Sequence, residues 1–257
     1  VEGIMPQTET VIRQALKEKV KPVLFINKVD RLIAELQVTP EDMMQRFGKI
    51  ITEVNKLIVR MVPEEFKKEW MVDAQAGTVA FGSAYHNWAT SLPFMAKKNV
   101  NFKQIYEFME KEQRRELAQA APLHEVLLDM IVEKLPSADA AQKYRIPHIW
   151  RGESEEDIGQ AMVNANANGD SAFMVTKVVL DPHAGEIAVG RLFSGTIKKG
   201  DQMYVAGMPN ANRVQSVGMF VGGDRIATET VTAGNIIAVS GLRAVSYTHL
   251  TLPTTLS

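Results

Sequence analysis

The hydrophobic pattern of the first part of the chain alternates between helical faces and short buried runs. Residues 7–19 place four apolar side chains on one helical face. The apolar run 22–26 that follows is short and unbroken, which favours a strand buried on both faces of a parallel sheet. A helix that leads into a buried strand predicts an α/β domain with helices flanking the sheet.

The same alternation continues for about one hundred residues. Thr39 and Pro40 are typical of a helix start, and apolar residues recur at helical spacing across 43–61. Residues 79–81 form a second short buried run, which ends at Gly82. Further helices are predicted over 102–119 and over 122–135, the second between two prolines.

The pattern changes in the second half of the chain. Residues 136–168 are weakly patterned, and we expect them to be a connector that closes a first domain of residues 1–168. From residue 169 to 244, short Val-, Ile- and Phe-rich segments alternate with turn clusters, which predicts an antiparallel β-barrel. Residues 245–257 hold no charged side chain and are rich in Thr, Leu and Ser. We expect this tail to be foreign sequence joined to a truncated reading frame.

The composition narrows the class of protein only a little. The 257 residues are 46% hydrophobic and 23% charged, which is ordinary for a globular protein, and the net charge of −1 predicts no nucleic-acid-binding stripe. The chain has no Cys, which excludes disulfides and thiolate metal sites and favours a reducing compartment, so we expect a cytoplasmic protein. No apolar run approaches the roughly 18 residues of a membrane span, and we expect no membrane partner.

The strongest chemical signal is the tetrapeptide Asn27-Lys28-Val29-Asp30, directly after the first buried strand. One carboxylate can accept hydrogen bonds from both N1–H and the 2-amino group of guanine, and adenine cannot make that pair. Asp30 suits this role, Asn27 can bond the base N7 and tie neighbouring loops, and the stem of Lys28 can cover the base. A plain surface turn is the alternative, because such tetrapeptides also occur by chance.

A second signal follows the second buried strand. Ser83 can brace the loop around Asp30, and the small Ala84 lets its backbone N–H approach guanine O6. Alone, this tripeptide Gly82-Ser83-Ala84 indicates a tight turn. Together the two loops predict a guanine site, because both leave the C-terminal ends of strands, where open α/β sheets bind ligands.

The sequence also lacks several motifs. No G-x-x-x-x-G-K-[ST] stretch is present to hold phosphates, and residues 195–201 are a hairpin turn that resembles one only loosely. No pair of Mg²⁺ ligands and no residue to orient an attacking water is apparent, so no catalytic residue and no metal ligand is assigned. The five histidines show no metal-ligand spacing, and we expect each to be a surface or satisfied residue. They are His86, His124, His148, His183 and His249.

Several long stretches carry a family resemblance. They are V-E-G-I-M-P-Q-T-E-T from residue 1, P-V-L-F-I-N-K-V-D from residue 22, V-A-F-G-S-A-Y-H-N-W-A from residue 79 and G-R-L-F-S-G-T-I-K-K-G-D from residue 190. Over residues 1 to about 243 the chain resembles the archaeal and eukaryotic elongation factor 2 family of translational GTPases. The resemblance implies a truncated P-loop-type GTPase domain with a helical insertion at about 31–75. This domain is followed by the second domain of translational GTPases, a β-barrel that is incomplete here.

The resemblance also implies a function. In that family the N-K-x-D and S-A loops bind the guanine of GTP or GDP, which maps onto Asn27, Lys28, Asp30, Ser83 and Ala84. The intact protein hydrolyses GTP on the ribosome as tRNA and mRNA move, and the barrel docks on the small ribosomal subunit. The phosphate loop, the switch regions, the catalytic His and the Mg²⁺ ligands are expected upstream of Val1, so we expect a monomeric fragment that is inactive alone.

Two other interpretations stay open at this point. The chain could be a non-catalytic module in which only the barrel and helices dock on the ribosome or on a protein. It could also derive from another translational GTPase, such as the bacterial-type translocase or a release factor. The sequence after A-F-G-S-A and the helical segment 102–135 favour the archaeal and eukaryotic form.

Overall fold

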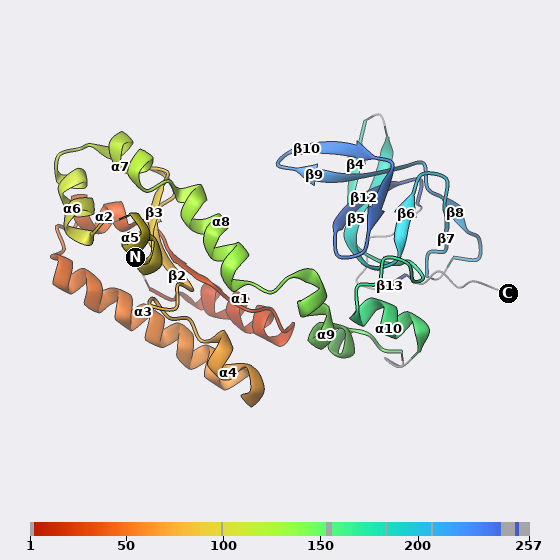
Figure 1. Ribbon diagram of the computed structural model, residues 1–257, viewed down its shortest axis with the longest axis horizontal. Helices are drawn as coiled ribbons and strands as arrows, with labels where there is room; N and C mark the ends of the chain where they lie inside the picture. Colours follow the sequence, from red (N-terminus) through yellow and green to blue (C-terminus); the bar gives the residue numbers. More distant parts are fainter. Residues whose placement is uncertain are drawn as a thin grey trace. The chain divides into compact units, whose positions relative to one another are not determined.

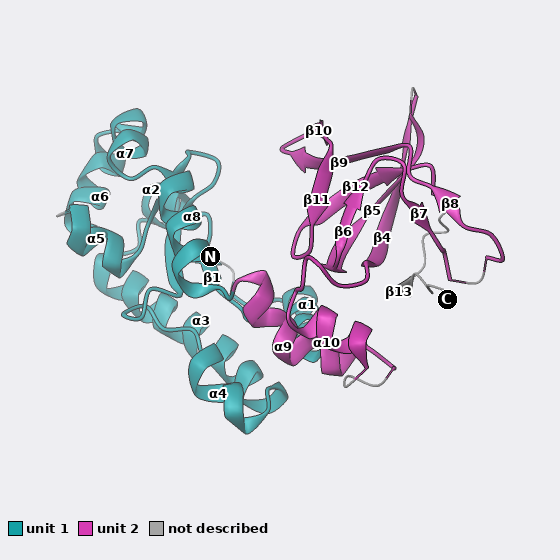
Figure 2. Ribbon diagram, turned by 45° about the vertical axis from the view of Figure 1, so that its right-hand side comes forward, with its two compact units in different colours: residues 1–136 teal, residues 137–257 magenta. Residues whose placement is uncertain are grey.

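The chain folds into two compact units, residues 1–136 and residues 137–257 (Figure 2). The computed structural model describes residues 3–98, 100–152, 156–182, 184–206 and 208–242, together with the backbone of 250–251. The sequence predicts a domain boundary near residue 168, whereas the segment from 137 to 168 belongs to the second compact unit. Each unit is described by itself.

The first unit is built on a three-stranded sheet in the order β1-β2-β3. Figure 1 labels two of these strands, β2 and β3. β1 and β2 are parallel, with Leu24 opposite Val79 and Ile26 opposite Phe81, and β3 is antiparallel to β2. The strands are β1 (Leu24–Ile26), β2 (Val79–Ser83) and β3 (Trp88–Thr90). The helices are α1 (Pro6–Lys17), α2 (Val29–Ala34), α3 (Pro40–Met61), α4 (Glu64–Trp70), α5 (Leu92–Lys98), α6 (Phe102–Glu110), α7 (Arg114–Ala120) and α8 (Leu123–Lys134). The predicted α/β class is confirmed for this unit.

The helical segment between β1 and β2 packs onto the sheet. The N-cap Thr39 accepts a hydrogen bond from the Asp42 backbone N–H at 3.2 Å, and Pro40 occupies the first turn of α3, as the sequence predicts. Phe47 of α3 then stacks on Phe81 of β2, with ring centroids 4.7 Å apart. This contact packs the apolar face of α3 against the sheet. The chain then returns to the sheet and forms β2, which is parallel to β1.

The single helix predicted over 102–119 is wrong, because the chain forms α6 and α7 instead. α6 ends where Glu112 adopts a left-handed φ of 55°. The N–H of Gln113 donates to the carbonyl of Phe108, and the N–H of Glu112 donates to the carbonyl of Met109. This pair of hydrogen bonds closes a helix C-terminus. The break went unpredicted because a Gly or Asn usually marks such a helix end in a sequence, and here the left-handed residue is Glu112.

In its described residues, the second unit consists of antiparallel strands and two helices. Its largest sheet has six strands in the order β10-β9-β12-β5-β4-β13, and two-stranded ladders join β11 to β6 and β7 to β8. The strands are β4 (Ala172–Asp181), β5 (Gly185–Ser194), β6 (Thr196–Lys198), β7 (Gln202–Met203), β8 (Asn212–Arg213), β9 (Ser216–Val221), β10 (Asp224–Thr228), β11 (Thr230–Thr232), β12 (Ile236–Ser240) and β13 (Leu250–Thr251). One buried apolar cluster draws side chains from β4, β5, β6, β7, β9, β11 and β12. The predicted barrel-like antiparallel fold is confirmed.

The described part of segment 137–168 contains helices, although its sequence is weakly patterned. It contains α9 (Ala138–Ile149) and α10 (Asp157–Val163). Gln142 of α9 is 2% exposed and donates from Nε2 to the carbonyls of Met162 and Phe193, the latter at 2.9 Å. A buried polar side chain thus joins α9 to α10 and to β5. This explains why hydrophobic periodicity alone did not reveal the helix.

Most of the predicted foreign tail, residues 245–257, lies outside the described residues. The backbone of β13 pairs with β4 at the edge of the sheet, with Leu250 opposite Met174 and Thr251 opposite Phe173. The origin of the tail stays a prediction. In the part of the chain that the structure describes, no helix has both the length and the apolar character that a bilayer crossing requires.

Candidate nucleotide-binding site

The two loops singled out in the sequence meet at one edge of the first sheet. β1 ends at Ile26, directly before Asn27, and β2 ends at Ser83. Since β1 and β2 are parallel neighbours, their C-terminal ends lie side by side. The backbone N–H of Ala84 donates to Asn27 Oδ1 at 3.0 Å, although the two residues are 57 positions apart. The expected convergence of the loops is confirmed.

Asn27 also shapes the loop to which it belongs. Its Oδ1 accepts a second hydrogen bond from the backbone N–H of Lys28 at 2.8 Å. Lys28 precedes α2 with a φ of 64°, a left-handed conformation that is uncommon for a residue other than Gly, Asn or Asp. The hydrogen bond helps to hold this strained turn, which starts α2 and places Asp30 in its first turn. The Lys28 side chain is exposed.

The carboxylate of Asp30 is largely buried and only partly satisfied. Its side chain is 15% exposed, and Oδ2 lies 3.6 Å from Nε2 of His86. Oδ1 is buried and has no hydrogen-bond partner among the residues that the structure describes. A buried acceptor without a donor destabilises a protein by about 1–3 kcal/mol, and more when it is charged. Oδ1 therefore has acceptor capacity that no described residue of the protein uses.

Ser83 and Gly82 shape the second loop. Ser83 is 1% exposed, and its Oγ accepts the backbone N–H of His86 at 3.3 Å. The sequence predicts that Ser83 braces the loop around Asp30. In the structure Ser83 holds His86, and His86 in turn faces Asp30. At Gly82 a Cβ atom would lie 2.3 Å from the carbonyl oxygen of Trp88, so only glycine lets β3 approach this closely.

Ala84 is placed at the site, but its backbone donor is engaged within the protein. The sequence assigns the N–H of Ala84 to guanine O6, and in the structure this N–H bonds Asn27 Oδ1. Its side chain is exposed at the loop surface. The contact with O6 therefore stays a prediction, and the observed role of this N–H is to join the two loops.

The loops border an open cleft with a volume of about 510 Å³, within the usual range for small-molecule sites. The lining residues are Asn27, Lys28, Asp30, Arg31, Ala34, Glu35, Ser83, Tyr85, His86, Met109 and Arg114. Sequence reasoning missed His86, although it lies only three positions after Ser83. It also missed Met109 and Arg114, because both are far from the two loops in the sequence and no local motif connects them to the site.

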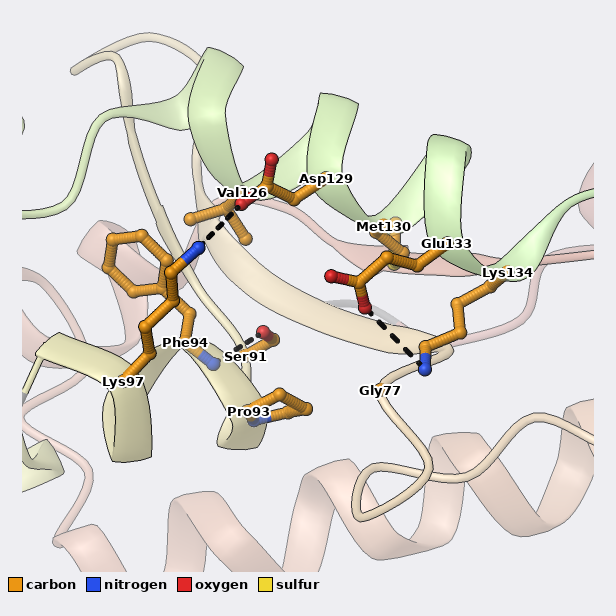
Figure 3. A pocket seen from close by; sticks show the side chains of 10 residues that line it. All are labelled: Gly77, Ser91, Pro93, Phe94, Lys97, Val126, Asp129, Met130, Glu133 and Lys134. Atoms are coloured by element: carbon orange, nitrogen blue, oxygen red, sulfur yellow. Dashed lines mark hydrogen bonds and ion pairs between the residues drawn. The ribbon is translucent and has the colours of Figure 1, made fainter.

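A second hollow in the first unit is too small for a nucleotide. It lies between α5 and α8 and holds about 50 Å³. Figure 3 shows Lys97 of α5 reaching toward Asp129 of α8, with Nζ 3.6 Å from Oδ2. Ser91 Oγ accepts the Phe94 backbone N–H at 3.3 Å below them. This volume admits a few water molecules at most, and the ion pair joins two helices.

The described residues do not fit a metal centre. Across the described ranges, no three His, Asp or Glu side chains gather closely enough to hold a metal ion. In the cleft, Asp30 pairs with His86, and Glu35 pairs with Arg31 at 2.9 Å. These residues alone offer no Mg²⁺ site, so no chemical step is assigned to a metal held by this chain.

Comparison with known proteins decides the family. Residues 1–137, more than half of the chain, match the family described as Elongation factor Tu GTP binding domain. The chain belongs to the translational GTPase family. Residues 170–250 match a second family, Elongation factor G domain 2, which corresponds to the barrel-like unit of this translational GTPase chain.

Individual relatives extend the match along the chain. Proteins named Elongation factor 2 from Methanococcus vannielii, Picrophilus torridus and Pyrococcus horikoshii are each 58% identical to this translational GTPase chain over 243 residues. The aligned part is 95% of this chain and 33% of each relative. The chain thus spans about one third of the length of these relatives.

Proposed function

We propose that this chain is part of elongation factor 2, a GTPase that acts in ribosomal translocation, and that it supplies the guanine-recognition part of that protein. The hydrogen bond between Asn27 Oδ1 and the Ala84 N–H carries the proposal, because it unites the two predicted guanine loops at one sheet edge. Asp30 lines the same cleft, and its Oδ1 has no hydrogen-bond partner among the described residues, which supports guanine as the ligand.

The proposed binding mode follows from the donors that guanine presents. N1–H and the 2-amino group bond the carboxylate of Asp30, and the Asn27 amide bonds N7. The exposed Lys28 covers one face of the base with its methylene stem. Ser83 and Ala84 set the shape of the second loop, in which the Ala84 N–H bonds Asn27 Oδ1, and guanine O6 is proposed to face this loop.

The phosphates and Mg²⁺ of GTP are held by parts of the protein other than the residues described. The sequence contains no G-x-x-x-x-G-K-[ST] loop, and the described residues gather no metal ligands. The 257-residue chain is therefore inactive by itself in this proposal. It acts as a monomer in the cytoplasm, without a membrane partner.

The barrel-like unit is proposed to dock on the small ribosomal subunit. The match of residues 170–250 to Elongation factor G domain 2 and the relatives named Elongation factor 2 support this partner. The identity of 58% to those relatives favours this assignment over another translational GTPase or a module without a nucleotide.

The test is a change of nucleotide preference in the full-length protein that carries these residues. Asp30→Asn replaces one acceptor oxygen with an NH₂ donor, which opposes a donor of guanine. Xanthine has a carbonyl in place of the 2-amino group and supplies the acceptor that the new amide needs. We expect Asp30→Asn to weaken GTP and strengthen XTP, so that competition binding shows a reversed preference. An equal loss of both nucleotides, or no change, would remove Asp30 from the site.

A further inference from the structure

We infer that His86 is a positioning residue for guanine recognition, which acts by orienting the carboxylate of Asp30. The inference rests on the proposed function of the site and adds a residue to which sequence reasoning gave no role. It starts from the difference between the two oxygens of Asp30. Oδ2 faces His86 Nε2 at 3.6 Å, and Oδ1 has no hydrogen-bond partner within the described residues.

The imidazole is held in place from the second loop. The backbone N–H of His86 donates to Oγ of the buried Ser83 at 3.3 Å, so the residue is anchored to the end of β2. The ring packs edge-to-face against Tyr85, with centroids 4.8 Å apart. The His86 side chain is 17% exposed, close to the 15% of Asp30. Both partners are thus shielded from water, which strengthens an electrostatic contact between them.

A side chain from each loop therefore contacts the other loop or its neighbouring residue. Asn27 of the first loop receives the backbone N–H of Ala84 in the second loop at 3.0 Å. His86 of the second loop faces the side chain of Asp30 near the first loop. The first contact fixes the spacing of the loops, and the second involves Oδ2 and leaves Oδ1 without a partner among the described residues.

A carboxylate has enough acceptor sites to bond His86 and the base at the same time. An ionised carboxylate has about four acceptor sites, so Oδ2 can serve both His86 and one donor of the base. Oδ1 accepts the other donor of guanine. The separation of 3.6 Å is longer than a formed hydrogen bond of about 3 Å, and such contacts shorten when a ligand fills the site. An Nε2–H directed at Oδ2 prevents the carboxylate from rotating away from the base.

Three matched variants separate this role from simple packing. His86→Gln places an amide nitrogen at about the reach of Nε2 and keeps a donor for Oδ2. His86→Asn has an amide nitrogen at the position of Nδ1, too short to reach Asp30. His86→Leu fills a similar volume with no donor. Thermal denaturation of each variant establishes that it is folded before binding is measured.

The experiment measures the dissociation constants of GDP and XDP for the full-length protein that carries these residues, by competition with a fluorescent nucleotide. We expect His86→Leu and His86→Asn to reduce the preference for GDP over XDP about tenfold, the usual size of one charge-assisted hydrogen bond. The loss falls on GDP, because XDP makes no paired contact with Asp30. His86→Gln retains most of the preference of the wild type.

The outcomes distinguish this inference from the proposed function. If the wild type prefers GDP and His86→Leu keeps the full preference, the role of His86 is wrong and guanine recognition stands. An equal weakening of GDP and XDP by His86→Leu, without rescue by His86→Gln, would show a merely structural residue. If the wild type itself does not prefer GDP, the proposed function fails, and the role of His86 fails with it.

Discussion

Asn27 and Ala84 lie 57 positions apart in the chain and share one hydrogen bond of 3.0 Å. The oxygen that accepts it also accepts the N–H of Lys28, so one side-chain atom defines two backbone positions at the candidate site. A carbonyl oxygen has two lone pairs, and both are used here within the protein. The spacing of the two loops is thus fixed by contacts within the protein itself.

This relationship leads to a prediction for the 257-residue chain itself. Asn27→Ala removes the acceptor of the Ala84 N–H, whereas Asn27→Asp keeps an oxygen at the same position. A net contribution of about 1 kcal/mol for the hydrogen bond corresponds to about fivefold faster amide exchange at Ala84 in Asn27→Ala. Hydrogen exchange measured by NMR checks this. Unchanged exchange at Ala84 in Asn27→Ala would show that the contact does not hold the loops together in solution.

The second prediction concerns the buried Gln142 of α9. Gln142→Ala removes the donor to Met162 O and Phe193 O and leaves a small cavity, so we expect the free energy of unfolding to fall by about 2–4 kcal/mol. Gln142→Met fills the volume without a donor and isolates the polar contribution, about 1–3 kcal/mol. Urea denaturation of the chain measures both changes. Two variants as stable as the wild type would mean that α9 does not depend on this side chain.

The third prediction concerns catalysis. The purified 257-residue chain should hydrolyse GTP no faster than background, with or without ribosomes, since its sequence has no phosphate loop and its described residues gather no metal ligands. Release of inorganic phosphate from labelled GTP is the measurement, with a full-length elongation factor 2 as the positive control. Turnover that ribosomes stimulate in the chain alone would contradict the proposed division of the nucleotide site.

Much of the local structure follows from the sequence because it depends on contacts between near neighbours. Thr39 and Pro40 predict the start of α3, and the apolar runs predict β1 and β2. The position of Asp30 after β1 is likewise a local feature. The order of polar and apolar residues contains this information, since a helix cap or a buried strand involves only a few adjacent positions.

Elements stabilised by distant contacts were less predictable. α6 ends at a left-handed Glu112 without the usual glycine, and α9 buries a glutamine whose partners are on α10 and β5. The carbonyls that accept from this glutamine come within reach only in the folded chain, whereas α6 closes through local backbone hydrogen bonds at a residue that is not glycine. Hydrophobic periodicity records which residues avoid water, and it contains no information on where a buried donor finds its acceptor.

The candidate site shows the same division. The strand-loop units that carry Asn27, Asp30 and Ser83 can be predicted from the sequence, because each unit is a short continuous segment. The bond from the N–H of Ala84 to Asn27 and the contact of His86 with Asp30 could not be predicted in this way. Those contacts require the parallel pairing of β1 with β2, which closes a loop of more than fifty residues. Distances between side chains so far apart in sequence are set by the packing of the whole unit, and no local pattern encodes them.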